Sequence, residues 1–150
     1  MKQNKIAKLA EEAFMKLDSC ILCPRKCGVN RLKGETGDCK TGRHAMISSF
    51  GPHFGEEPEI SGRQGSGTIF FTHCNLMCNF CQNYDISHLG RGREVDARQL
   101  SSIMLELQEM GCHNINFVTP SHVVPQILEA LHVAFDNGLV IPLIFNSSGY

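Results

Sequence analysis

The amino-acid sequence predicts an α/β fold with a parallel sheet, and three observations lead to this prediction. After residue 67, short apolar runs alternate with segments whose apolar residues recur at helical spacing. Each helical segment is long enough to carry the chain back across a sheet between two parallel strands. The chain has 150 residues, of which 42% are hydrophobic, and this is sufficient for one core. We therefore expect successive strand–helix–strand units.

The first fifty residues are predicted to contain a helix and a short strand. Lysine and glutamate occupy one face of the helix, and its apolar face consists of Ile6, Leu9, Ala10, Ala13, Phe14 and Leu17. The strand is expected at residues 44–50, before a loop at 51–67 that is rich in glycine and proline. In this loop His53, Glu56 and Glu57 are candidates for a role in a site, although a solvated loop explains them equally well.

The alternating elements follow in order. A buried strand is predicted at 68–71, and a helix begins after Asp96, where Gln99 completes a capping box, and stops at Gly111. The next strand covers 114–119, and Ser121 is expected to cap the helix that ends at Gly138. A third apolar strand at 139–145 is interrupted by Pro142.

The strand at 68–71 is expected to be the first of the sheet, with right-handed crossovers to the two later strands. The loops that follow all three strands would then lie on one rim. Active sites of β/α barrels and open α/β sheets lie on that rim.

Three cysteines follow the first of these strands at C-x3-C-x2-C spacing: Cys74, Cys78 and Cys81. Three thiolates so close together on one loop are typical of a metal site. They are one ligand short of a closed zinc site or an ordinary iron–sulfur cluster, so a ligand comes from elsewhere or one coordination position is open. A structural zinc loop completed by His73, His88 or a distant cysteine is the alternative.

This spacing, with Phe80 before the third cysteine, resembles the signature of radical S-adenosylmethionine (radical SAM) enzymes. The surrounding string GSGTIFFTHCNLMCNFCQNYDIS is similar to the branch related to pyruvate formate-lyase activating enzymes. The resemblance implies a four-iron four-sulfur (4Fe-4S) cluster on the three cysteines, with SAM on the fourth iron. Reductive cleavage of SAM would yield methionine and a 5′-deoxyadenosyl radical that abstracts hydrogen from a substrate.

The resemblance also implies cofactor-binding residues. Phe80 would lie near SAM, although a core aromatic is an equally good explanation. The family's Gly-Gly-Glu stretch after the second strand is replaced by Val-Thr-Pro-Ser-His, so the hydroxyls of Thr119 or Ser121 would take the place of a carboxylate. After the third strand, Asn146 and Ser148 are expected to contact SAM, or simply to form a turn.

A second cysteine set precedes these elements at C-x2-C-x3-C-x11-C spacing: Cys20, Cys23, Cys27 and Cys39. We predict a second metal site, with zinc and an auxiliary iron–sulfur cluster both open. The eighth cysteine, Cys112, is expected to be a buried free thiol, and His113, His122 and His132 are expected to be solvated or hydrogen-bonded without a ligand role.

Composition gives no indication of nucleic-acid or membrane binding. The formal net charge is -1, with 14 basic and 15 acidic residues mixed along the chain. No apolar run approaches the roughly 20 residues that span a bilayer, and the N-terminus does not resemble a signal peptide. A cytoplasmic location is expected.

The predicted organisation is an N-terminal helix and cysteine-rich segment (residues 1–50) followed by the first three βα units of a radical SAM barrel (51–150). Because a full β/α barrel takes about 250 residues, the chain is expected to be truncated after the third strand. The resemblance implies an oxidoreductase-type enzyme that is served by a reductant such as flavodoxin or ferredoxin and acts on a substrate that includes a protein glycine. The alternatives are a non-catalytic zinc or iron–sulfur module and a catalytically incompetent fragment.

Overall fold

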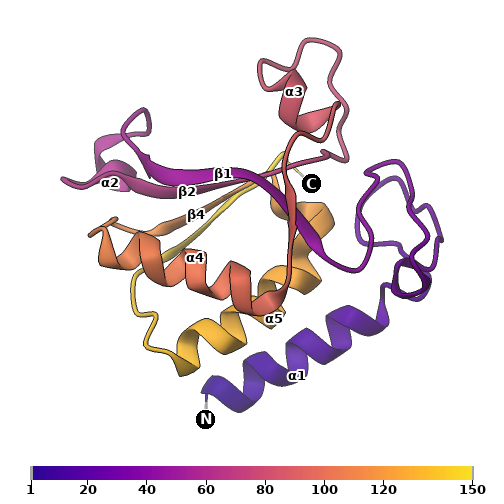
Figure 1. Ribbon diagram of the computed structural model, residues 1–150, viewed down its shortest axis with the longest axis horizontal. Helices are drawn as coiled ribbons and strands as arrows, with labels where there is room; N and C mark the ends of the chain where they lie inside the picture. Colours follow the sequence, from indigo (N-terminus) through magenta and orange to yellow (C-terminus); the bar gives the residue numbers. More distant parts are fainter. Residues whose placement is uncertain (1, 150) are drawn as a thin grey trace.

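The computed structural model describes residues 2–149, and the side chains of residues 5–149. Its elements alternate in the predicted manner after residue 65 (Figure 1). The helices are α1 (Lys2–Met15), α2 (Pro58–Ser61), α3 (Tyr84–Ser87), α4 (Ala97–Glu109) and α5 (Val124–Asp136), with 3₁₀ turns η1 (Arg31–Lys33) and η2 (Pro120–Val123). The strands are β1 (Ala45–His53), β2 (Ser66–Phe71), β3 (Arg93–Val95), β4 (Ile115–Val118) and β5 (Leu143–Asn146).

The five strands form one open, mixed sheet in the order β3-β1-β2-β4-β5. The pairs β2–β4 and β4–β5 are parallel, as predicted, and each is connected through a helix. The prediction of a wholly parallel sheet that starts at residue 68 is wrong, because β1 pairs antiparallel with both β2 and β3. A short connection is sufficient between antiparallel strands, whereas parallel strands need a longer crossover.

Three short elements were not predicted. The strand β3 has three residues, two of them exposed, so it shows neither an apolar run nor an alternating pattern. The helices α2 and α3 have only four residues each, which is too short for a helical period to be visible. Short elements of this kind are formed by their tertiary contacts rather than by local pattern.

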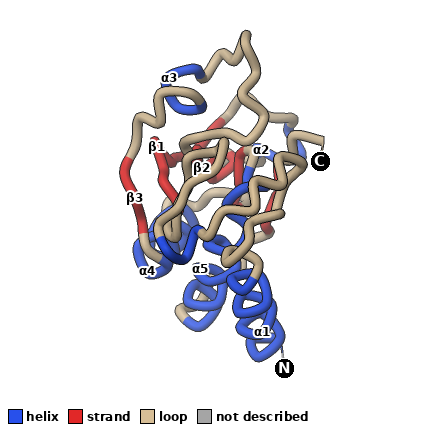
Figure 2. The backbone as a smooth tube through the Cα atoms, turned by 90° about the vertical axis from the view of Figure 1, so that its right-hand side faces the viewer, coloured by secondary structure: helices blue, strands red, loops and turns tan. Residues whose placement is uncertain are grey.

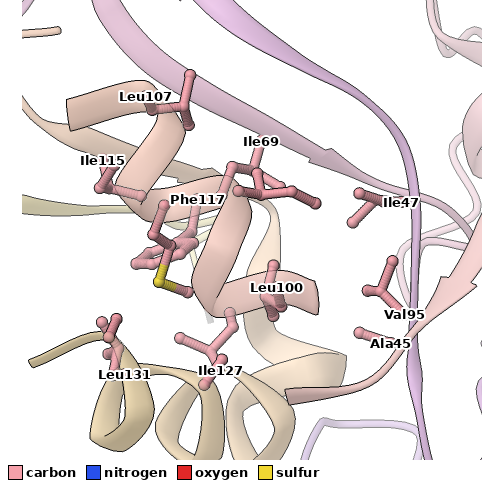
Figure 3. Close-up of a cluster of buried hydrophobic side chains, with 14 of the residues drawn as sticks. Ala45, Ile47, Ile69, Val95, Leu100, Leu107, Ile115, Phe117, Ile127 and Leu131 are labelled. Carbon is pink, nitrogen blue, oxygen red and sulfur yellow. The ribbon is translucent and has the colours of Figure 1, made fainter. Parts of the chain in front are cut away.

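Helices α4 and α5 cover one face of the sheet, and α1 lies against α5 (Figure 1). The core between the sheet and these helices contains Ile69 from β2, Phe117 from β4, Leu100 from α4 and Ile127 from α5 (Figure 3). These side chains are at most 5% exposed. The alternating side chains of β2 and β4 therefore point to opposite faces, with the apolar set under the helices.

The start of α4 follows the prediction. Asp96 accepts a hydrogen bond from the Gln99 backbone N–H at 2.8 Å, and the Gln99 side chain accepts one from the Asp96 backbone N–H at 3.0 Å. These reciprocal bonds are the capping box.

The start of α5 differs from the prediction. Ser121 lies inside η2, the cap position of α5 is Val123, and no side chain caps this helix. Thr119 has the left-handed backbone conformation (φ 45°), and Pro120 then begins the 3₁₀ turn. This turn delays the helix by two residues, so the Ser121 hydroxyl is not at the helix N-terminus.

The third predicted strand is displaced. Residues 139–142 have no regular secondary structure, and β5 begins directly after Pro142 rather than containing it. Leu143 and Phe145 in β5 are 39% and 51% exposed. Within residues 2–149, no helix is both long and apolar enough to cross a membrane.

Candidate functional site

The loop of Cys74, Cys78 and Cys81 follows β2 at its carboxyl end, as predicted, and runs into α3. In Figure 1 this segment projects beyond the sheet. Its base is held by two backbone hydrogen bonds, from the His73 N–H to the Ile86 carbonyl and from the Cys74 N–H to the Ser87 carbonyl, both 3.1 Å. Cys78 is exposed, and the other two cysteines are partly exposed. The loop is therefore anchored at its base and open to solvent at its thiols.

The donor set of this loop fits a cluster with one open coordination position, because three thiols lie within eight residues on one exposed turn. Left-handed backbone at His73 (φ 56°) and Met77 (φ 54°) bends the loop before and within the cysteine motif. Among residues 2–149, no three cysteine, histidine, aspartate or glutamate side chains already surround a common metal position. Binding a cluster thus requires the thiols to turn inward.

The neighbouring strand ends carry buried polar atoms without hydrogen-bond partners. They include Thr72 Oγ1 after β2, Ser121 Oγ after β4 and Ser148 Oγ after β5. Each comes from a different strand of the parallel part of the sheet, at its carboxyl end. Buried polar groups are normally paired, so these three hydroxyls leave unused hydrogen-bonding capacity at this edge of the sheet.

The other residues expected at the cofactor lie on the same rim. Asn146 is the exposed last residue of β5, and its carbonyl accepts a hydrogen bond from the Thr119 N–H at 2.9 Å. Phe80 is 92% exposed, so the explanation as a core aromatic is wrong. An apolar ring this exposed next to two cysteines is available to a ligand.

His122, which was not expected to be special, is 1% exposed behind this rim. Its Nε2 lies 3.1 Å from the Thr72 carbonyl, just before the cysteine loop. Burial lowers the pKa of His122 to about 4, and the positive charge of Arg31 contributes in the same direction. The imidazole is therefore neutral at physiological pH and acts as a buried connection between β2 and η2.

The four N-terminal cysteines, Cys20, Cys23, Cys27 and Cys39, line a single small cavity of about 10 Å³. Three of them are buried, and Cys27 is half-buried. Gly37 lies so close to Cys27 that a β-carbon there would be 2.6 Å from Sγ. Burial raises the pKa of the Cys23 thiol, and the neighbouring thiols of the set add to this increase. The tertiary structure therefore brings together the set that was predicted as a second site.

Two arginines that the sequence analysis did not identify connect this cavity to the rim. Arg31 is 1% exposed and donates from Nη1 to the His122 carbonyl at 2.8 Å, while its Nη1 lies 3.8 Å from Cys20 Sγ. Arg25 donates to the carbonyls of Asn75 (2.9 Å) and Leu76 (3.0 Å) in the three-cysteine loop. A basic residue between two cysteines of a metal motif is the one signal that could have identified Arg25.

The acidic loop before β2 has a more modest role. Glu56 accepts a hydrogen bond from Asn116 Nδ2 at 3.3 Å and lies 3.7 Å from His53 Nδ1. Asn116 lies on the face of β4 away from the helices, so Glu56 covers the second face of the sheet. Glu57 precedes α2 without a side-chain cap. Of the three candidates, Glu56 and His53 are adjacent, and Glu57 lies apart from their contact.

No protein-family model and no solved structure matches this chain. Over its whole length, the chain is 30% identical to an uncharacterized protein of Methanocaldococcus jannaschii and spans 44% of the length of that protein. That relative has no described activity in its name, so it assigns no function to the chain. The functional inference therefore depends on the chain's own residues.

Proposed function

We propose that the chain is a radical SAM iron–sulfur protein, or part of one, whose cluster is held by Cys74, Cys78 and Cys81. The observation that carries the proposal is the position of these three thiols on an exposed loop at the carboxyl end of β2. Ligands of open α/β sheets bind at this edge of the strands. A set of three thiolates leaves one iron of a four-iron cluster without a protein ligand.

The residues around the loop would bind SAM rather than react with it. A 4Fe-4S cluster held by Cys74, Cys78 and Cys81 would, once reduced, supply the electron for reductive cleavage of the SAM sulfonium. The hydroxyls of Ser121 and Ser148 are buried without partners and could accept hydrogen bonds from the methionyl ammonium or ribose. Thr119 and Asn146, joined through their backbones, would position these two strand ends.

Phe80 would contribute an apolar face to the bound SAM. Its ring is almost fully exposed in the ligand-free chain, and covering it with the adenine would remove apolar surface from water. The resemblance to pyruvate formate-lyase activating enzymes extends the proposal to two partners. One is a flavodoxin- or ferredoxin-type reductant, and the other is a protein substrate from which a glycine hydrogen would be abstracted. A cytoplasmic location accords with chemistry that depends on reduced thiols.

The test is anaerobic reconstitution with iron and sulfide, followed by electron paramagnetic resonance with and without SAM. A reduced four-iron cluster whose signal changes on addition of SAM supports the proposal. Tightly held zinc at these three cysteines with no iron would overturn it and favour a non-catalytic metal module.

The first prediction concerns turnover. With a strong reductant, the reconstituted protein should release 5′-deoxyadenosine, and Cys78→Ala should abolish it because one iron loses its protein ligand. Cys112→Ala is the matched control, since Cys112 is a buried free thiol outside both cysteine sets. Turnover retained in Cys78→Ala would contradict the assignment. A SAM-responsive cluster without turnover would identify a binding-competent but catalytically incompetent chain.

A further inference from the structure

The second cysteine set has features that the proposed function does not use. Three of its thiols precede the 3₁₀ turn η1 and the fourth follows it, and yet all four line one cavity. Backbone hydrogen bonds join Cys20 to Val29 at 3.0 Å and to Gly28 at 2.9 Å, and they close the part of the stretch that carries the first three cysteines. A cross-link among the four side chains would tie Cys39 to that part.

The cavity is too small for a cluster as it stands. A volume of about 10 Å³ accommodates one atom the size of a water molecule. No three of these thiols already surround a common metal position among the described residues, so they would have to turn inward, and one metal ion with four sulfur ligands at about 2.3 Å is the smallest group that such a movement would accommodate. Four irons and four sulfides would need the cavity wall to open, and Gly37 against Cys27 shows how closely that wall is packed.

Buried charge provides an independent argument. Arg31 is almost fully buried, and its guanidinium has no carboxylate partner among the ion pairs of the described residues. Its Nη2 has no hydrogen-bond partner, and its Nη1 lies beside Cys20 Sγ. A buried cation is costly unless an anion compensates it. Four thiolates around one divalent ion carry a net double negative charge, which would provide this compensation.

From these observations we propose that Cys20, Cys23, Cys27 and Cys39 hold a single zinc ion in a closed tetrathiolate site, balanced by Arg31. The ion closes the turn between Cys23 and Cys27, and this turn presents Arg25 to the carbonyls of the three-cysteine loop. The zinc site is thus a structural support for the neighbouring loop. The proposal does not depend on the radical SAM assignment, because it concerns different cysteines.

The test isolates this site in a protein in which Cys74, Cys78 and Cys81 are all replaced by serine. Purified anaerobically, this protein should contain one zinc per chain and neither iron nor acid-labile sulfide. Substituting cobalt for zinc should give the visible spectrum of a tetrahedral tetrathiolate site. Iron with sulfide at this site, or no bound metal, would overturn the proposal.

Two further variants in the same background assign the ligands. Cys23→Ser should lower zinc retention against a competing chelator at least tenfold, whereas Cys112→Ser should leave it unchanged. Zinc retained equally in both would contradict the assignment. If Cys23→Ser fails to fold, Cys27→His decides, because histidine is itself a zinc ligand. That variant should keep the zinc and shift the cobalt spectrum to a three-sulfur, one-nitrogen pattern, and an unchanged spectrum would count against Cys27 as a ligand.

Discussion

The four N-terminal cysteines and the three cysteines after β2 differ most in what surrounds them. The first set lines an enclosed cavity beside a buried arginine. The second lies on an exposed loop before α3, and the backbone around α3 projects beyond the strands (Figure 2). Enclosure favours a metal whose coordination is complete, which stabilises the fold. Exposure favours a site with room for another ligand. We therefore expect similar residues at similar spacing to have different roles in these two environments.

The two sets are also physically connected. Arg25 from the first segment bonds to two carbonyls of the second loop, and Lys40 lies near enough to His73 to add to the lowering of its pKa by burial. His122 contacts both regions, through Arg31 on one side and Thr72 on the other. The closed region thus supports the open one.

The largest expected difference is in thiol reactivity. In metal-free protein, an alkylating reagent should modify Cys78 about a thousandfold faster than Cys23, since an opening that costs about 4 kcal/mol exposes the buried thiol only rarely. Peptide mapping by mass spectrometry measures each rate, and Cys112 serves as the buried reference. Equal alkylation rates for Cys23 and Cys78 would contradict the difference in exposure between the N-terminal cysteines and the cysteines after β2.

The next largest effect is expected at Arg31. Arg31→Met should lower the free energy of unfolding by about 3 kcal/mol, because the carbonyls of Gly42 and His122 lose a charged donor in the interior. The loss should be greater in zinc-loaded protein, where the thiolates also lose their counter-charge. Urea unfolding measures it, with exposed Arg98→Met as the matched control. A neutral or stabilising Arg31→Met would show that no anion is present nearby.

A pH dependence follows from His122. Its pKa is about 4 when folded and about 6.5 when unfolded, so the unfolded chain binds the extra proton first as the pH falls. The contribution of His122 to the free energy of unfolding is therefore at its maximum above pH 6.5, and the free energy should decrease by about 2 kcal/mol between pH 7.5 and pH 5.

His122→Gln should remove that part of the acid sensitivity, because glutamine does not titrate and can still donate to the Thr72 carbonyl. The measurement is urea unfolding of both proteins across this pH range. Exposed His113→Gln controls for the loss of a histidine. If the free energy of unfolding depended on pH in the same way in wild type and His122→Gln, His122 would not be the source of this acid sensitivity.

The smallest expected effect tests the connection between the two sets. Arg25→Gln loses two charged donors to the loop and should speed hydrogen exchange of the His73 and Cys74 amides roughly tenfold, which corresponds to about 1.4 kcal/mol. Lys26→Gln removes the same charge from the adjacent, exposed position and should not change these rates. Equal exchange in both variants would mean that the two regions are independent.

Local pattern in the sequence was sufficient for what depends on neighbouring residues. The spacing of apolar residues predicted α1, α4 and α5, the capping box predicted the start of α4, and the two cysteine motifs identified the sets that the structure places at the rim and around the cavity. The burial of Cys112 was also predicted. All of these are properties of a few adjacent residues, so the period of an element or the spacing of ligands reveals them.

Tertiary structure alone decided what depends on distant residues. The antiparallel pairing of β1, the 3₁₀ turn before α5, and the contacts of Arg25 with Asn75 and of Arg31 with His122 join segments that are far apart in the sequence. No local pattern encodes such contacts, because they form only when the core brings those segments together. For the same physical reason, the sequence predicted metal at both cysteine sets from their spacing alone, whereas only the fold distinguished an enclosed cavity from an open rim.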